Sequence, residues 1–118
     1  MPQTTLNGAR ITALHTVVGD QRRTVEEDFA RLGGDAAQLE RIQKTIGLAE
    51  RRVVGPETTA LDLGEAAARR LDCAGVDAVI FVTQTPDHFQ PSNAALLHGR
   101  LGLAENCTVF DVNQGCSG

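Results

Sequence analysis

The sequence predicts an α/β protein with a mainly parallel sheet, for three reasons. Strand-like and helix-like segments alternate along the 118 residues in the order βαα(β)αβαβ. Residues 76–83, VDAVIFVT, form a nearly continuous apolar run, which is typical of a central parallel strand covered on both faces. Residues 107–110, CTVF, form a second short run with the composition of a buried strand. No internal repeat or linker divides the chain, so one domain is expected.

The first third of the chain is predicted to hold a strand and two helices. Residues 9–17, ARITALHTV, alternate between two faces and predict the strand. Thr24 and Glu27 fit a capping box at a helix start, and the glycine pair that follows ends this helix. Asp35 is suited to cap a second helix, and Gly47 to end it.

The remaining elements follow from the same signals. Residues 49–54, AERRVV, are basic and lead into a short strand. Thr58 or Thr59 begins a third helix, whose glycine and alanines give it a flat side for packing close to a sheet. The apolar run 76–83 leads into a polar loop, 83–91, and a fourth helix begins at about Ser92.

The last stretch, residues 107–118, places a thiol in a turn built from small residues. Cys116 lies between Gly115 and Ser117, and small neighbours permit a sharp turn that exposes the central side chain. A helix beginning at Cys116 favours thiolate over thiol through its N-terminal dipole and free N–H groups. The strand, the turn and the cysteine together predict an activated nucleophile.

Composition excludes several classes of partner. The net charge of −4 argues against a nucleic acid or an anionic membrane. No apolar run approaches about 20 residues, so no membrane span is expected. The three cysteines have no zinc-like spacing, which predicts free thiols in a reducing cytoplasm and no metal site.

The other thiols and imidazoles are weaker candidates for chemistry. Cys73 and Cys107 have the character of small core residues. His15 and His98 are interpreted as structural, whereas His88 lies in the 83–91 loop and either faces solvent or lines an entrance. A hydrolase nucleophile elbow requires glycine two residues before the nucleophile, and Gln114 occupies that position.

Three motifs, in order and in register, resemble β-ketoacyl–acyl carrier protein synthase III and its relatives in the thiolase superfamily. Residues 46–52, IGLAERR, resemble the T-G-I-x-E-R-[RH] segment of this family. Residues 79–87, VIFVTQTPD, resemble its apolar strand and T-x-T-P-D loop, and the following Pro-Ser pair resembles its helix start. Residues 110–118, FDVNQGCSG, resemble the D-[IV]-x-x-x-C-x-G segment around the catalytic cysteine.

This resemblance implies a fold, a reaction and partners. The fold is the five-layered α-β-α-β-α thiolase fold, of which residues 1–118 are expected to form most of the first half, an N-terminal half-domain cut at the nucleophile turn. Cys116 accepts an acyl group from a coenzyme A or acyl carrier protein thioester, and a malonyl-type thioester then condenses with it. The implied assembly is a homodimer with no permanently bound cofactor. The catalytic His and Asn belong to the C-terminal half, so residues 1–118 are expected to need a second segment.

Some positions depart from the family pattern. Arg41 and Thr45 replace the Trp and Arg that usually hold the adenine of coenzyme A, and Ala49 replaces a basic residue. Gln90 stands where the Phe that reaches the partner subunit is usual, with Phe89 one place earlier. These departures favour a specialised branch, such as secondary-metabolite or surface-glycolipid acyl chemistry.

Five residues besides Cys116 are candidates for substrate binding. Arg51 and Arg52 are suited to contact a phosphate of pantetheine or of a carrier protein, the alternative being a solvated or salt-bridged pair. Thr83 and Phe89, with Gln90 beside them, are suited to line the acyl tunnel or the dimer contact, the alternative being ordinary loop packing. A competing function is a non-catalytic subunit or scaffold half, against which the retained Cys116 argues.

Overall fold

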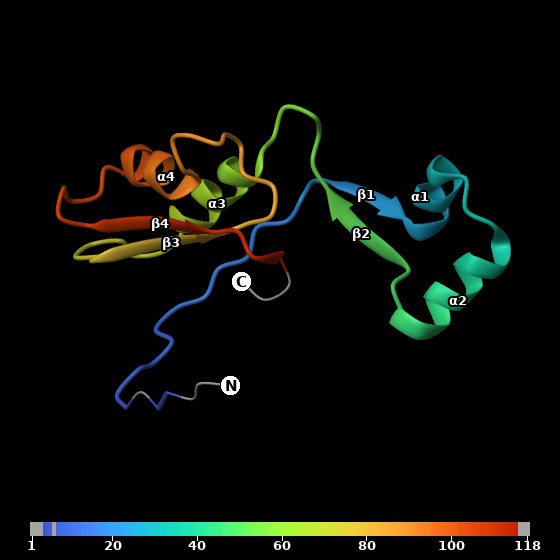
Figure 1. Cartoon of the computed structure of the whole chain (residues 1–118), viewed down its shortest axis with the longest axis horizontal. Coiled ribbons are helices and arrows are strands. Elements are labelled where there is room, and N and C mark those ends of the chain that lie inside the picture. Colours follow the sequence, from blue (N-terminus) through green and yellow to red (C-terminus); the bar gives the residue numbers. More distant parts are fainter. Residues whose placement is uncertain (1–3, 6, 116–118) are drawn as a thin grey trace.

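Two small lobes, residues 21–53 and 60–112, make up the computed structural model, which describes residues 4–5 and 7–115 (Figure 1). Every extensive contact between elements falls within one lobe or the other. The radius of gyration is 18.1 Å, whereas a compact domain of this length has about 13.5 Å. The described chain is therefore extended, and each lobe relies on its own contacts.

The first lobe is a two-stranded ribbon with two helices at one end. Its elements are β1 (Gln21–Thr24), α1 (Val25–Leu32), α2 (Ala36–Ile46) and β2 (Glu50–Val53). The predicted capping box is confirmed, because Thr24 Oγ1 accepts from Glu27 N at 3.2 Å and Glu27 Oε2 accepts from Thr24 N at 2.8 Å. The cap at Asp35 and the left-handed end at Gly47 are confirmed as well.

Two expectations for this part of the chain are wrong. Residues 9–17 form no strand, and Ile11 and Leu14 are 90% and 86% exposed. A strand needs a neighbour to pair with, and none of the described residues pairs with this segment. The strands also do not form one sheet: β3 and β4 are a parallel pair, as predicted, but β1 and β2 form a separate antiparallel pair. The two helices carry the chain out and back, so β2 returns beside β1 in the opposite direction (Figure 1).

The second lobe packs two helices on a parallel pair of strands. Its elements are α3 (Ala60–Ala68), β3 (Ala78–Val82), α4 (Asn93–Leu101) and β4 (Thr108–Val112). Leu61, Leu97 and Cys107 are buried between the layers. A Cβ on Gly64 would lie 2.7 Å from the ring of Phe81, which confirms the flat side expected of the third helix.

The helices cover one face of the β3–β4 sheet (Figure 1). Val79 and Phe81 are half-buried on that face. On the other face Ile80, Val82 and Phe110 are 56%, 57% and 45% exposed. The sequence predicts cover on both faces, and the described residues supply it on one. Among those residues, no helix has the length and apolarity needed to cross a membrane.

Candidate functional site

The candidate site lies at the carboxyl ends of β3 and β4. The strands are parallel neighbours, so the loop 83–91 after β3 and the turn 113–115 after β4 meet at one edge of the sheet. Thr83 N donates to Val112 O at 3.1 Å and ties the two segments together. A hollow of about 210 Å³ opens there, and Thr83, Phe89 and Asn113 are among the residues that line it.

The turn 113–115 depends on a glycine. Gly115 has φ of +60°, a left-handed conformation, and a Cβ there would lie 2.7 Å from Gln84 Nε2. Any other residue is strained in this conformation, and its Cβ would also displace the flexible end of the Gln84 side chain. The predicted nucleophile, Cys116, follows directly in the sequence. Cys116, Ser117 and Gly118 lie outside the described residues, so the proposed role of this thiol stays a prediction.

A polar network that sequence reasoning missed lies beside this turn. Asn93 is fully buried, and its amide pairs with Asp87: Asp87 N donates to Asn93 Oδ1 at 3.1 Å, and Asn93 Nδ2 donates to Asp87 Oδ1 at 3.3 Å. Asp111 accepts the backbone N–H groups of Asn93 and Ala94 at 2.8 and 2.7 Å. Asp87 Oδ1 also accepts from Leu61 N at 3.3 Å. The signal for it was present in the sequence: an aspartate in the last apolar strand and an Asn directly after a helix cap.

The structure brings three of the five substrate-binding candidates together. Thr83 and Phe89 line the 210 Å³ hollow, and Gln90 is exposed next to them. The side chain of Phe89 is fully exposed, so it is not part of ordinary loop packing. Thr83 Oγ1 accepts from Thr85 N at 3.1 Å, which fixes the start of the loop. His88, the histidine of this loop, lines the same hollow.

Arg51 and Arg52 are not brought to this site. They lie on β2 in the other lobe (Figure 1). Arg51 Nε donates to Asp28 Oδ2 at 2.6 Å, and this bond holds the pKa of Asp28 below its ordinary value and raises that of Arg51. Arg52 Nη1 donates to the carbonyl oxygen of Asp20 at 3.4 Å. Arg51 is therefore salt-bridged, as the alternative interpretation of this pair expects.

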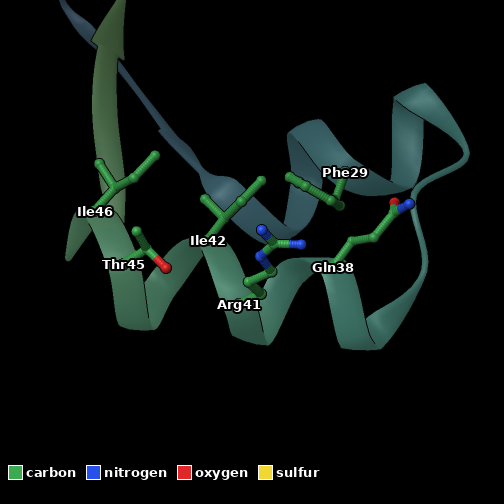
Figure 2. A pocket seen from close by; sticks show the side chains of 6 residues that line it. All are labelled: Phe29, Gln38, Arg41, Ile42, Thr45 and Ile46. Atoms are coloured by element: carbon green, nitrogen blue, oxygen red, sulfur yellow. The ribbon is translucent and has the colours of Figure 1, made fainter.

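A second hollow, of about 350 Å³, lies between α1 and α2 (Figure 2). Phe29, Ile42 and Ile46 provide its apolar lining. Arg41 and Thr45, the two departures from the family pattern, line the same hollow. It contains an apolar surface and one cation, which suits a ligand with an apolar part and a negative group.

The remaining thiols and imidazoles have structural surroundings. Cys107 is buried and Cys73 is half-buried, and both are free. The ring of His98 lies 2.9 Å from the carbonyl oxygen of Ala104, which it bonds across the end of α4. His15 is exposed in the segment that forms no strand, so the structural role expected for it is not found.

Comparisons with known proteins point to one family, although no family model matches the chain. Over 98% of its length the chain is 33% identical to a Campylobacter jejuni protein provisionally named 3-oxoacyl-[acyl-carrier-protein] synthase 3, of which it covers 35%. Over 65% of its length it is 45% identical to β-ketoacyl-[acyl-carrier-protein] synthase III of Thioalkalivibrio sulfidiphilus, of which it covers 26%.

Solved structures agree. The synthase III of Thermus thermophilus superposes with a TM-score of 0.73 and 34% identity, over 93% of this chain and 35% of that one. The chain thus spans about a third of the length of its relatives, and the match is to their N-terminal part. It shares the thiolase-like α/β fold of that part, as the motifs predict.

Proposed function

We propose that this chain, a homologue of the N-terminal third of β-ketoacyl-[acyl-carrier-protein] synthase III, is the nucleophile-bearing part of an acyl-transferring condensing enzyme. The observation that carries the proposal is the 33% identity over 98% of the chain to a relative with that name. The position of the site supports it, because the turn before Cys116 lies at the carboxyl ends of two parallel strands beside a hollow.

In the first step the Cys116 thiolate attacks the carbonyl carbon of an acyl thioester. A new carbon–sulfur bond forms, and the bond to the donor sulfur breaks, so the donor leaves as a thiolate. In the second step a malonyl-type thioester loses carbon dioxide, and its carbanion attacks the acyl carbon and releases Cys116. Thr83, Phe89 and Gln90 are assigned to the mouth of the acyl site. Thr83 and Phe89 line the hollow beside the turn, Gln90 follows Phe89 in the chain, and the exposed Phe89 ring is available to an apolar chain.

We assign the other catalytic groups, a His and an Asn, to a C-terminal half that the relatives have beyond the matched third. Its packing on this chain would cover Ile80, Val82 and Phe110, which are now exposed. A homodimer through β4 is proposed because this strand pairs on one side only within the described residues.

The donor is proposed to be a coenzyme A or acyl carrier protein thioester, and no permanently bound cofactor is proposed. Arg51 and Arg52 are candidates to meet its phosphate, although Arg51 would have to share its guanidinium with Asp28. Arg41 and Thr45 in the hollow between α1 and α2 support a specialised acyl donor over the common primer. The free thiols Cys73 and Cys107 support a location in the cytoplasm.

Intact-mass measurement after incubation with a panel of acyl thioesters tests this function. The wild-type protein and the control variant Cys73→Ala are expected to gain one acyl group, and Cys116→Ala none. An acylated Cys116→Ala protein would contradict the assignment of the nucleophile. A wild-type protein that no thioester acylates, and whose Cys116 reacts with iodoacetamide no faster than Cys73, would favour the non-catalytic subunit.

A further inference from the structure

The buried amide of Asn93 and the carboxylates of Asp87 and Asp111 connect four segments at one point. Asp111 belongs to β4, Asn93 opens α4, Asp87 belongs to the loop 83–91, and Leu61 lies in the first turn of α3. Asn93 has no exposed surface, and no buried side-chain polar atom among the described residues lacks a partner. A buried network in which every member is satisfied holds its parts in one arrangement.

Asp111 makes the central contact. Its two carboxylate oxygens accept from the first two N–H groups of α4, at 2.8 Å from Asn93 N and 2.7 Å from Ala94 N. Hydrogen bonds to a charged acceptor are roughly twice as strong as neutral ones, and a bidentate pair fixes direction as well as distance. Asp111 therefore fixes β4 to the start of α4, four residues before the turn ends at Gly115.

The turn that follows is hydrogen-bonded at its start and lies close to the Gln84 side chain at its end. Val112 O accepts from Thr83 N at 3.1 Å, and Gly115 lies against the side chain of Gln84. A shift of β4 relative to α4 would move residues 113–115 and the residue after them. Chemistry at a nucleophile is sensitive to such shifts, since a misplacement of about 1 Å reduces rates by about 100-fold.

We propose that Asp111, Asn93 and Asp87 are positioning residues: they fix the end of β4 to the N-termini of α3 and α4, and so hold the turn 113–115 that directly precedes Cys116 in the sequence. This proposal rests on the proposed function of Cys116. The three residues touch no reacting atom in this scheme. They act through the backbone of the turn, although Asp111 also lines the hollow beside Thr83 and Phe89, so binding and rate are measured separately.

Alkylation of the wild-type protein by iodoacetamide, followed by mass spectrometry of each cysteine, gives the first readout. Asp111→Asn keeps one acceptor oxygen and places an amide N–H₂ group against the other backbone N–H. We expect Cys116 to react about tenfold more slowly in Asp111→Asn and more slowly still in Asp111→Ala, because alkylation follows the thiolate character that a well-placed turn maintains. Thr24→Ala removes the cap of α1 in the other lobe, where Thr24 Oγ1 accepts from Glu27 N at 3.2 Å, and serves as the matched control. It is expected to lower the melting temperature and leave the rate at Cys116 unchanged.

The second readout separates positioning from general loss of structure. The saturating acylation rate is expected to fall in Asp111→Asn, while the thioester concentration for half-saturation stays within about twofold, because asparagine has nearly the size of aspartate and keeps the lining of the hollow. Folding of each variant is checked by circular dichroism. If Asp111→Asn does not fold, Asp87→Asn takes its place, with an expected loss of about threefold. A folded variant whose Cys116 reacts at the wild-type rate overturns the positioning role alone. A wild-type Cys116 that reacts no faster than Cys73 overturns the proposed function and this role together.

Discussion

The two lobes of the molecule are held together by different kinds of interaction. In the first lobe Val25 is the one described hydrophobic side chain that is buried. Its ribbon places arginines directly opposite each other, Arg22 across from Arg52 and Arg23 across from Arg51. Like charges in such positions repel, and Asp28 and Glu50 offset the repulsion by pairing with three of the four guanidinium groups, those of Arg22, Arg23 and Arg51.

The second lobe relies on burial. Leu61 and Ala94 have no exposed surface, Leu97 and Cys107 are nearly buried, and Asn93 is buried with its partners. Surface ion pairs occur in both lobes and contribute little each, so the lobe that holds the site is distinguished by its buried core. With so little buried surface, the first lobe depends on packing against further protein for its stability. The second lobe has a buried core of its own on which the turn before the nucleophile rests.

The largest expected difference between the two lobes is in the free energy of unfolding that is lost when a large apolar side chain is removed. Leu61→Ala in the second lobe is expected to lower the free energy of unfolding by about 3 kcal/mol, because it leaves a cavity between α3 and the sheet. Leu32→Ala in the first lobe is the control, since Leu32 is 84% exposed, and a change within about 0.5 kcal/mol is expected. Urea unfolding measures both. Equal losses would show that the two lobes do not differ in the way burial indicates.

A smaller effect is expected at the contact between α3 and β3. Gly64→Ala improves helix propensity by about 1 kcal/mol, but the new Cβ meets the Phe81 ring at 2.7 Å, and overpacking costs about 1–3 kcal/mol. The clash should dominate, with a net loss of about 1 kcal/mol. Gly99→Ala in α4 is the matched control, because nothing lies within 4 Å of its Cβ, and it should stabilise by about 0.5–1 kcal/mol.

The double variant Gly64→Ala, Phe81→Leu tests whether the clash with the Phe81 ring causes the loss of stability, as measured by thermal unfolding. The smaller side chain opens room for the new methyl group, so Gly64→Ala should be less harmful in the Phe81→Leu background than alone. If Gly64→Ala is as stabilising as Gly99→Ala, the close approach of α3 to the sheet would be contradicted.

Local signals predicted most of the helices, because a helix start is decided by neighbours in sequence. Thr24, Asp35 and Ser92 each accept from the N–H group three residues ahead, as their residue types indicate. A strand is decided by its partner, which local patterns do not contain. Residues 9–17 alternate like a strand and pair with none of the described residues.

The local parts of the candidate site were predictable from the sequence, and its long-range contacts were not. The loop 83–91 and the turn at Gly115 are marked by their own residues. The polar residues of the network, Asp87, Asn93 and Asp111, are visible in the sequence, but they lie 6 to 18 positions apart and no local pattern indicates that they pair with one another. The separation of Arg51 from the loop 83–91 was missed as well, because it depends on how the two lobes are connected.

The smallest expected effect concerns the ion pairs of the first lobe. The hydrogen bond from Arg51 is the main cause that lowers the pKa of Asp28 from its ordinary value of 3.8. Because the folded pKa lies below the unfolded one, this pair adds stability above about pH 3.8, and that stability is lost as the pH falls through the folded pKa. Arg51→Met should therefore lower the melting temperature slightly at pH 7 and make it less dependent on pH below 4.

Arg52→Met tests whether the carboxylate is the cause. Arg52 lies next to Arg51 on β2 and donates to the carbonyl oxygen of Asp20, which does not titrate. Its removal should leave the pH dependence of the melting temperature unchanged. Added salt should reduce the difference between wild type and Arg51→Met, because Arg51 is half-exposed and its charge is screened. If both variants lose the same acid dependence, the pairing of Arg51 with Asp28 would not explain how the first lobe is held.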